Sequence, residues 1–198
     1  MLEAAELDCE RGGRALFRKL GFSVKGGELA RIAGANGSGK TSLLRILCGL
    51  LTPAAGEVRW QGSSIKSLKE EYSRQLVYLG HAPAVKDDLT AVETLYASCA
   101  LAGLPAGGIE GAVQRFGVPM HKAVRHLSQG QRRRAALARL ALSAAVPLWL
   151  LDEPFTALDA AAAELTRQLI REHLARGGAI VYTTHQDAGL SDSRVVEL

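Results

Sequence analysis

The sequence predicts an α/β fold with an antiparallel β edge and an inserted α-helical subdomain. Three observations predict it: strand-like and helical segments alternate at both ends of the chain, a stretch of helical composition lies between them, and a continuous apolar run follows that stretch. Of the 198 residues, 47% are hydrophobic. This is enough to bury one core, so we expect a single domain over residues 1–198, with the helical subdomain at about residues 82–142.

Strands dominate the expected structure of the first 80 residues. A Lys-Gly-Gly turn separates the first two strands from a short apolar strand, which leads into a glycine-rich loop. After this loop, the spacing of apolar residues over 42–51 predicts a helix. The strands are expected at residues 2–10, 15–24, 28–33, 56–61 and 75–79.

Helices are expected from about residue 83 to residue 142. Two of them fall at residues 90–102 and 109–116, and Ser128 has the side chain that favours the start of a third. The apolar run at residues 147–151 is typical of a strand buried on both faces. A helix over residues 160–176, ended by two glycines, and a strand over 179–184 complete the pattern.

Composition and charge exclude several classes of protein. Cys9, Cys48 and Cys99 are odd in number and far apart, which argues against a disulfide framework and against a zinc site. The longest uncharged stretch, residues 94–109, is shorter than the roughly 18 residues that a membrane span needs, and glycine and proline interrupt it. The net charge of +4 suits nucleic acid, an anionic ligand or an anionic membrane face, so it decides nothing alone.

Residues 34–42, GANGSGKTS, match the phosphate-loop pattern G-x-x-x-x-G-K-[ST] between an apolar strand and an amphipathic helix. Glycines let backbone N–H groups converge on a phosphate, and the helix N-terminus adds the positive end of its dipole. Lys40 can reach the β- and γ-phosphates, and Thr41 can offer a hydroxyl to Mg²⁺. We expect a nucleoside triphosphate to bind at Gly34, Ala35, Asn36, Gly37, Ser38, Gly39, Lys40, Thr41 and Ser42.

Two adjacent carboxylates follow the buried apolar strand in the stretch PLWLLDEPF. In phosphate-loop proteins the ligand lies beyond the carboxyl ends of the parallel strands. Asp152 is therefore expected to bind Mg²⁺, directly or through water. Glu153 is expected to orient or deprotonate the attacking water. Adjacent carboxylates more often form a solvated strand end, but the apolar run and the phosphate loop favour the functional interpretation.

The motifs together resemble those of ABC-type ATPase domains, in order and in spacing, over nearly the whole chain. They are residues 34–41, LSQGQ at 127–131, LLDEP at 150–154, ALD at 157–159 and His185. The usual signature is Leu-Ser-Gly-Gly-Gln, so Gln129 departs from its commonest third residue. The resemblance implies a P-loop NTPase core of the ABC ATPase type that binds and hydrolyses ATP with Mg²⁺. The absence of an Asn-Lys-x-Asp motif weakens the alternative of a GTPase.

The resemblance also implies a head-to-tail homodimer with two ATP molecules at its interface. Ser128, Gly130 and Gln131 would lie at the γ-phosphate of ATP held by the second copy, and Asp159 would belong to a loop crossing the interface. His185 would be the switch histidine that contacts the γ-phosphate, completing a catalytic set with Lys40 and Glu153. The three arginines at 132–134 are then expected to support the site, with no nucleic acid as partner.

Two positions depart from the common family pattern. His81 stands where a glutamine is usual, and a histidine there can ligate or hydrogen-bond near Mg²⁺. The expected metal set is thus Thr41, Asp152 and His81. Arg11 stands where an aromatic residue usually stacks on adenine. Because a guanidinium plane can also stack on a base, Arg11 is a candidate for the base contact.

Residues 78–95, YLGHAPAVKDDLTAVETL, are similar to the ATP-binding subunits of the haem exporter of bacterial cytochrome c maturation, and so is the opening LDCERGGRALFRKLGFSVKGGEL. This similarity implies an ATPase that powers haem export or delivery in c-type cytochrome biogenesis. Its partners would be an integral membrane transporter subunit and components of the haem pathway. It would lie peripherally on the cytoplasmic side of the bacterial inner membrane, docked through its helical subdomain around Asp87–Thr90.

Three alternatives remain at this stage. The first is another ABC export ATPase, acting on lipid, drug or peptide, in which His81 is incidental. The second is a non-transport ABC ATPase of translation or DNA repair, although such proteins carry a second domain or a long coiled coil for which 198 residues leave no room. The third is a small-molecule kinase, in which the signature at residues 127–131 would have no purpose.

Overall fold

A parallel sheet lies at the centre of the computed structural model, which describes residues 1–185, 188–190 and 193–198. In the described part of the chain its strands run in the order β6 (Leu76–Leu79), β7 (Leu148–Asp152), β8 (Ala179–Thr183), β3 (Leu29–Ala33) and β9 (Arg194–Glu197). Every neighbouring pair is parallel. The carboxyl ends of these strands therefore meet at one edge of the sheet, where Asp152 lies opposite Thr183.

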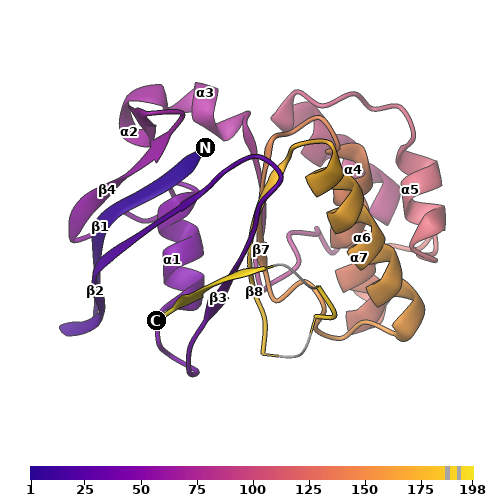
Figure 1. Ribbon diagram of the computed structural model, residues 1–198. Helices are drawn as coiled ribbons and strands as arrows, with labels where there is room; N and C mark the ends of the chain where they lie inside the picture. Colours follow the sequence, from indigo (N-terminus) through magenta and orange to yellow (C-terminus); the bar gives the residue numbers. More distant parts are fainter. Residues whose placement is uncertain (186–187, 191–192) are drawn as a thin grey trace.

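A second, antiparallel sheet is built largely from the start of the chain. Its strand order is β2 (Arg14–Val24), β1 (Leu2–Arg11), β4 (Ala55–Trp60) and β5 (Ser63–Ser64). Helix α1 (Lys40–Leu47) lies between this sheet and the parallel sheet (Figure 1). Its leucines at 43, 44 and 47 are fully buried, because they pack against both sheets in one apolar cluster.

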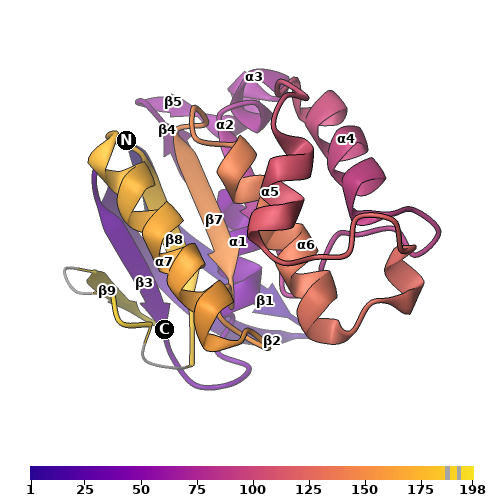
Figure 2. The same ribbon diagram turned by 90° about the vertical axis from the view of Figure 1, so that its right-hand side faces the viewer.

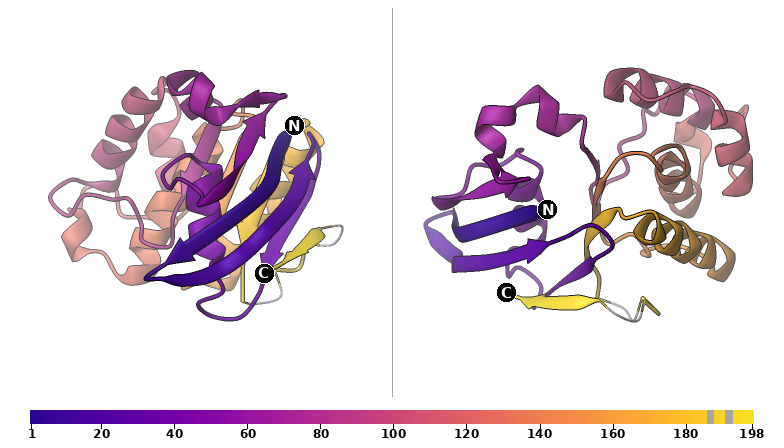
Figure 3. Two further views of the ribbon diagram at one scale, coloured as in Figure 1. Left: turned by 90° about the vertical axis from the view of Figure 1, so that its left-hand side faces the viewer. Right: turned by 45° about the horizontal axis from the view of Figure 1, so that its top comes forward.

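Four helices cover the opposite face of the parallel sheet (Figures 2 and 3). They are α4 (Ala91–Ala102), α5 (Ile109–Arg115), α6 (Gln129–Leu142) and α7 (Ala160–Ala175). In β7, Leu148 and Leu150 face the α1 side, whereas Trp149 and Leu151 face these helices. Both faces are buried, which explains why this strand is a continuous apolar run. None of the helices in the described ranges has the length and apolar character that crossing a membrane requires.

The segment before α4 is tied to the turn before α6. Backbone hydrogen bonds join Val124 N–H to the Leu89 carbonyl and Arg125 N–H to the Asp87 carbonyl, at 2.8 and 3.0 Å. Thr90 caps α4 in a capping box with Glu93, at the point where this pairing ends. The helices α4, α5 and the short 3₁₀ turn Val124–His126 thus precede the signature residues as one connected layer. Their status as a separate subdomain stays a prediction.

The structure confirms the predicted α/β fold class and differs from the expected elements in three places. Helix α1 ends at Leu47 instead of residue 51, because Gly49 adopts a left-handed backbone (φ 79°) that ends the helix and leaves Leu50 70% exposed. The segment Arg194–Glu197, which lies after the last expected strand, pairs with β3 as strand β9. Two single-turn helices, α2 (Ile65–Leu68) and α3 (Glu70–Ser73), occupy the polar segment between β4 and β6.

Candidate functional site

A cavity of about 670 Å³ opens at the carboxyl edge of the parallel sheet. It gathers side chains from the loop after β3, from the ends of β6, β7 and β8, and from the antiparallel sheet. The lining residues are Arg11, Leu16, Asn36, Gly37, Gly39, Lys40, Thr41, Ser42, His81, Asp152, Glu153, Thr156 and His185. The structure therefore brings together most of the residues that the sequence nominates for phosphate, metal and water.

The phosphate loop joins β3 to α1 and turns sharply at its last glycine. Gly39 has φ 108°, a conformation that side-chain-bearing residues rarely adopt, and α1 begins at the next residue. The ammonium of Lys40 is folded back over the loop, where its Nζ donates to the carbonyls of Gly34 and Ala35 at 2.8 and 2.9 Å. An ammonium has three donors, so one remains for a phosphate oxygen.

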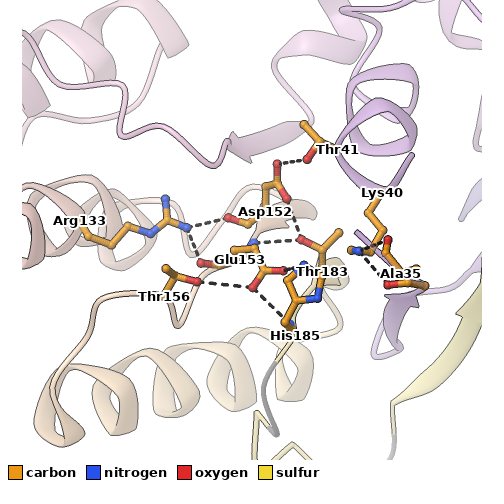
Figure 4. A network of polar contacts seen from close by, with 10 residues as sticks. Ala35, Lys40, Thr41, Arg133, Asp152, Glu153, Thr156, Thr183 and His185 are labelled. Atoms are coloured by element: carbon orange, nitrogen blue, oxygen red, sulfur yellow. Dashed lines mark hydrogen bonds and ion pairs between the residues drawn. The ribbon is translucent and has the colours of Figure 1, made fainter. Parts of the chain in front are cut away.

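Oxygen donors suited to a hard cation meet beside the loop (Figure 4). The Thr41 hydroxyl donates to Asp152 Oδ2 at 2.9 Å, and the Thr183 hydroxyl of the neighbouring strand donates to Oδ1 at 2.7 Å. The described residues contain no cluster of three or more His, Cys, Asp or Glu side chains. Thr41 and Asp152 fit Mg²⁺, which takes few protein oxygens and completes its octahedron with phosphate and water. His81 lines the same cavity as an exposed residue, and its part in metal binding stays a prediction.

Glu153 is a buried residue of the cavity lining and has a strained backbone. Its φ of 51° is uncommon for a residue with a side chain, and its N–H is fixed by a bond of 3.0 Å to the Thr183 hydroxyl. Oε2 accepts from His185 N–H at 3.3 Å and from the Thr156 hydroxyl at 3.4 Å. Oε1 lies 3.3 Å from His185 Nε2 but accepts no well-aligned hydrogen bond from the described residues. Glu153 lines the cavity with a carboxylate that can accept a proton from a water molecule bound there.

The signature residues form a second group at the start of α6. Ser128 and Gln131 make a reciprocal capping box, in which Ser128 N–H donates to Oε1 of Gln131 at 2.9 Å and Gln131 N–H donates to Oγ of Ser128 at 3.2 Å. At Gly130, a Cβ atom would lie 3.0 Å from the Ala157 carbonyl, which explains the need for glycine. Asp159 caps α7 through Ala162 N–H at 2.8 Å. None of Ser128, Gly130, Gln131 and Asp159 lines the 670 Å³ cavity of this chain.

Each of the three arginines that follow the signature forms an ion pair or hydrogen bonds with other residues of the same chain. Arg132 pairs with Asp87 at 2.9 Å and Arg134 with Asp159 at 3.3 Å. Arg133 is only 5% exposed, and its guanidinium donates to the carbonyls of Asp152 and Glu153 (Figure 4). It also donates to the carbonyls of Gly80 and His81. Burial lowers the pKa of Arg133, although the carboxylates of Asp152 and Glu153 act in the opposite direction.

Arg133 is a site residue that the sequence prediction did not single out, and so are Thr156 and Thr183. The three arginines were expected to support the site as one helix face. A signal was present, because Arg133 shares its helical face with Leu137 and Leu140, which lie four and seven residues later and are both fully buried. Helical spacing alone thus distinguishes the buried Arg133 from the partly buried Arg132 and Arg134.

Comparison with known proteins gives concordant results. Residues 17–156 match the family model described as "ABC transporter". The chain is 50% identical over 203 residues to the "Cytochrome c biogenesis ATP-binding export protein CcmA" of Nitrosomonas europaea, with 100% of this chain and 94% of the relative covered. It is 52% identical over 192 residues to the protein of the same name from Aromatoleum aromaticum, with 95% and 90% covered.

Solved structures agree with the fold. One described as "Structure of ATP binding subunit of ABC transporter" is 26% identical with a TM-score of 0.85, and the match covers 96% of this chain and 81% of that one. A dimeric ATP-binding cassette in a post-hydrolysis state has the same TM-score at 23% identity, with 100% and 94% covered. At that identity the second likeness concerns the fold alone.

Proposed function

The chain belongs to the ABC transporter family, and we infer from this that it is the ATP-hydrolysing subunit of an export system in c-type cytochrome biogenesis. The observation that carries the inference is the cavity in which Lys40, Asp152 and Glu153 meet, in a chain about half identical over its whole length to export proteins of cytochrome c biogenesis. ATP binding and hydrolysis are the activity, and transport is the work to which they are coupled.

The roles of the cavity residues in hydrolysis are proposals that rest on their contacts. The free donor of Lys40 and the N–H groups of the loop bind the β- and γ-phosphates. Mg²⁺ held by Thr41 and Asp152 would neutralise charge on the phosphate oxygens. Glu153 accepts the proton of the attacking water, and His185, whose side chain is 47% exposed, contacts both Glu153 and the place of the γ-phosphate. Arg11, on the rim, contributes to the base contact.

The head-to-tail homodimer is supported by the absence of the signature residues from the lining of this chain's cavity. Ser128, Gly130 and Gln131 present a helix N-terminus, which suits an anion, but they lie outside the lining of the phosphate-loop cavity of their own chain. A second copy turned head to tail places each helix N-terminus over the other copy's nucleotide. Asp159, 57% exposed in its side chain and paired with Arg134, belongs to the loop at the same interface.

Replacing Ser128 with arginine tests this arrangement. We expect the variant chain to bind ATP as the wild type does, because Ser128 is absent from its own cavity, but to hydrolyse ATP about 100-fold more slowly, because the long cation blocks the donors offered to the other copy's phosphate. Nucleotide titration of the dilute chain and steady-state phosphate release measure the two effects. Ser67→Arg, an exposed serine in α2, is the matched control. Loss of ATP binding by the isolated Ser128→Arg chain would contradict the assignment.

The membrane partner and the haem pathway complete the proposal. The chain is proposed to lie peripherally on the cytoplasmic side of the bacterial inner membrane, docked on an integral membrane subunit through the layer α4–α6. Asp87–Thr90 is the proposed contact, since this segment exposes its two aspartates, is paired with residues 123–125 and is bound by Arg132 to the start of α6. A displacement of this segment by the membrane subunit would therefore move the signature residues through these bonds.

The cellular role is tested by measuring covalently bound haem in the c-type cytochromes of the native host after deletion of the chain. We expect bound haem to disappear, and to return with the wild type but not with a Glu153→Gln variant, because delivery requires hydrolysis. Intact cytochromes after deletion would refute the haem pathway while leaving the ATPase assignment in place. Copurification would then identify the membrane partner.

A further inference from the structure

Arg133 reaches across from α6 to the ends of two strands that carry catalytic groups. Its Nη1 donates to the carbonyls of Gly80 and His81 at 2.9 and 3.3 Å, beyond the end of β6. Its Nη2 donates to the carbonyls of Asp152 and Glu153, both at 2.7 Å, at the end of β7. One side chain thus fixes the backbone next to the proposed metal ligands and next to the proposed base.

This guanidinium is buried among neutral carbonyls. In the part of the chain that the structure describes, its hydrogen bonds go to four backbone oxygens, and its Nε is buried without a hydrogen-bond partner. Burial of a cation is costly unless it is paired and fully hydrogen-bonded, and an apolar residue of similar size often gives equal stability. Leu137 occupies the same helical face one turn later with full burial. Packing alone therefore does not explain an arginine here.

The carbonyl of Glu153 belongs to a strained residue. A φ of 51° persists in a non-glycine residue only when its surroundings hold it. Here the hydroxyl of Thr183 holds the N–H side of Glu153 and Arg133 holds the carbonyl side. The direction of the Glu153 carboxylate consequently depends on both bonds.

We propose that Arg133 is a positioning residue that makes the geometry of Glu153 depend on the position of the signature helix of the same chain. The proposal rests on the head-to-tail dimer, in which each composite site joins the phosphate loop of one copy to the signature of the other. Arg133 would link the two composite sites. Ser128, five residues earlier on α6, contacts the other copy's nucleotide, and Arg133 transmits the resulting placement of α6 to Glu153 and to the backbone of His81. Each copy would thereby adjust its own base according to the nucleotide that its signature has engaged.

Kinetics of Arg133→Met and Arg133→Lys provide the first test. We expect Arg133→Met to lower kcat about 100-fold with little change in the KM for ATP, because a displaced base slows chemistry without affecting phosphate binding. Arg133→Lys should restore part of kcat, since an ammonium can bond some of the carbonyls but lacks the planar fork. Arg139→Met removes a half-buried guanidinium near the other end of α6 and should keep the wild-type kcat. A rise in KM with unchanged kcat would overturn the proposal.

Mixed dimers of two differently tagged chains then separate action within a chain from action across the interface. When one copy carries both Ser128→Arg and Arg133→Met, the first change disables the partner's site and the second disables the copy's own site, so hydrolysis should be lost. When the two changes are on different copies, both fall on one composite site, and the other site keeps its own Arg133 and an intact signature from the other copy, so part of the hydrolysis should remain. The reverse pattern would mean that Arg133 only supports its own signature loop, and would overturn the proposal.

The pairing of wild type with Ser128→Arg is the control for the dimer itself. Less than half of the activity should remain, because the blocked signature also leaves Glu153 of its own copy without the placement that Arg133 transmits. About half of the activity would mean that each composite site works alone, and would overturn the coupling. Unchanged activity would refute the head-to-tail arrangement, and the coupling between copies would fall with it. The structural part of the proposal has a separate measurement, amide hydrogen exchange in the chain alone. Arg133→Met should speed exchange at residues 80–82 and 152–156 more than at 127–131. Faster exchange confined to 127–131 would contradict it.

Discussion

Replacing Glu153 with glutamine is expected to stop hydrolysis while ATP stays bound, so that closed dimers accumulate. The amide keeps the shape of the side chain but cannot take the proton of the attacking water, and loss of a general base costs about 10²- to 10⁴-fold in rate. It also removes the negative charge beside the phosphates, which favours the closed, ATP-bound dimer. Phosphate release and light scattering after size-exclusion chromatography, each with and without ATP, measure the two effects.

The matched control is Glu71→Gln, which neutralises an exposed carboxylate in α3. It should hydrolyse ATP at the wild-type rate and should not change the oligomeric state. If Glu153→Gln hydrolysed ATP normally, Glu153 would lose its role as the base. If the variant were inactive but formed no more ATP-bound dimer than the wild type, the carboxylate would act in hydrolysis without governing dimer closure.

Replacing Lys40 with alanine is expected to abolish productive nucleotide binding. The ammonium bonds the carbonyls of Gly34 and Ala35 and is only 8% exposed, so its loss removes the cation aimed at the phosphates and leaves both loop carbonyls without this donor. Hydrogen bonds to charged groups contribute about 1.5–3 kcal/mol each, so one lost phosphate bond alone weakens ATP about 10- to 150-fold. Calorimetric titration with ATP measures the affinity directly.

Lys66→Ala removes an exposed lysine from α2 and provides the control, for which we expect unchanged affinity. The two Lys40 effects can be told apart by the unfolding midpoint. A loop destabilised by its unpaired carbonyls lowers the midpoint without nucleotide, whereas loss of the phosphate contact does not. Wild-type ATP affinity in Lys40→Ala would contradict the proposed role of this residue.

Much of the fold and of the cavity could be predicted because the determining signals are local. The phosphate loop is a contiguous pattern, the apolar run of β7 reports burial on both faces, and Asp152 and Glu153 follow it directly. Parallel strands share their carboxyl edge, so these local signals also place Lys40 and Glu153 at one cavity. The roles of these residues in binding and catalysis stay predictions.

What could not be predicted depends on contacts between distant segments. Strand β9 has only four residues, and its pairing with β3 spans more than 160 positions of sequence. In the sequence, Thr183 is an ordinary β-strand residue. Only the strand register shows that it lies opposite Asp152 and that its hydroxyl bonds that carboxylate. The four carbonyls that Arg133 contacts leave no trace in the sequence, because every residue has a carbonyl. The helical period shows that Arg133 points inward, but not what it meets.

The position of α1 between the two sheets has a thermodynamic consequence. A helix packed on both sides opens only at a free energy near that of global unfolding. Local openings of lower free energy therefore leave intact the phosphate loop that leads into α1. Ligand that binds only the native loop then raises the free energy of global unfolding, by about 2.7 kcal/mol at a concentration 100 times the dissociation constant. The melting temperature of the entire chain accordingly serves as a gauge of how fully its nucleotide site is occupied.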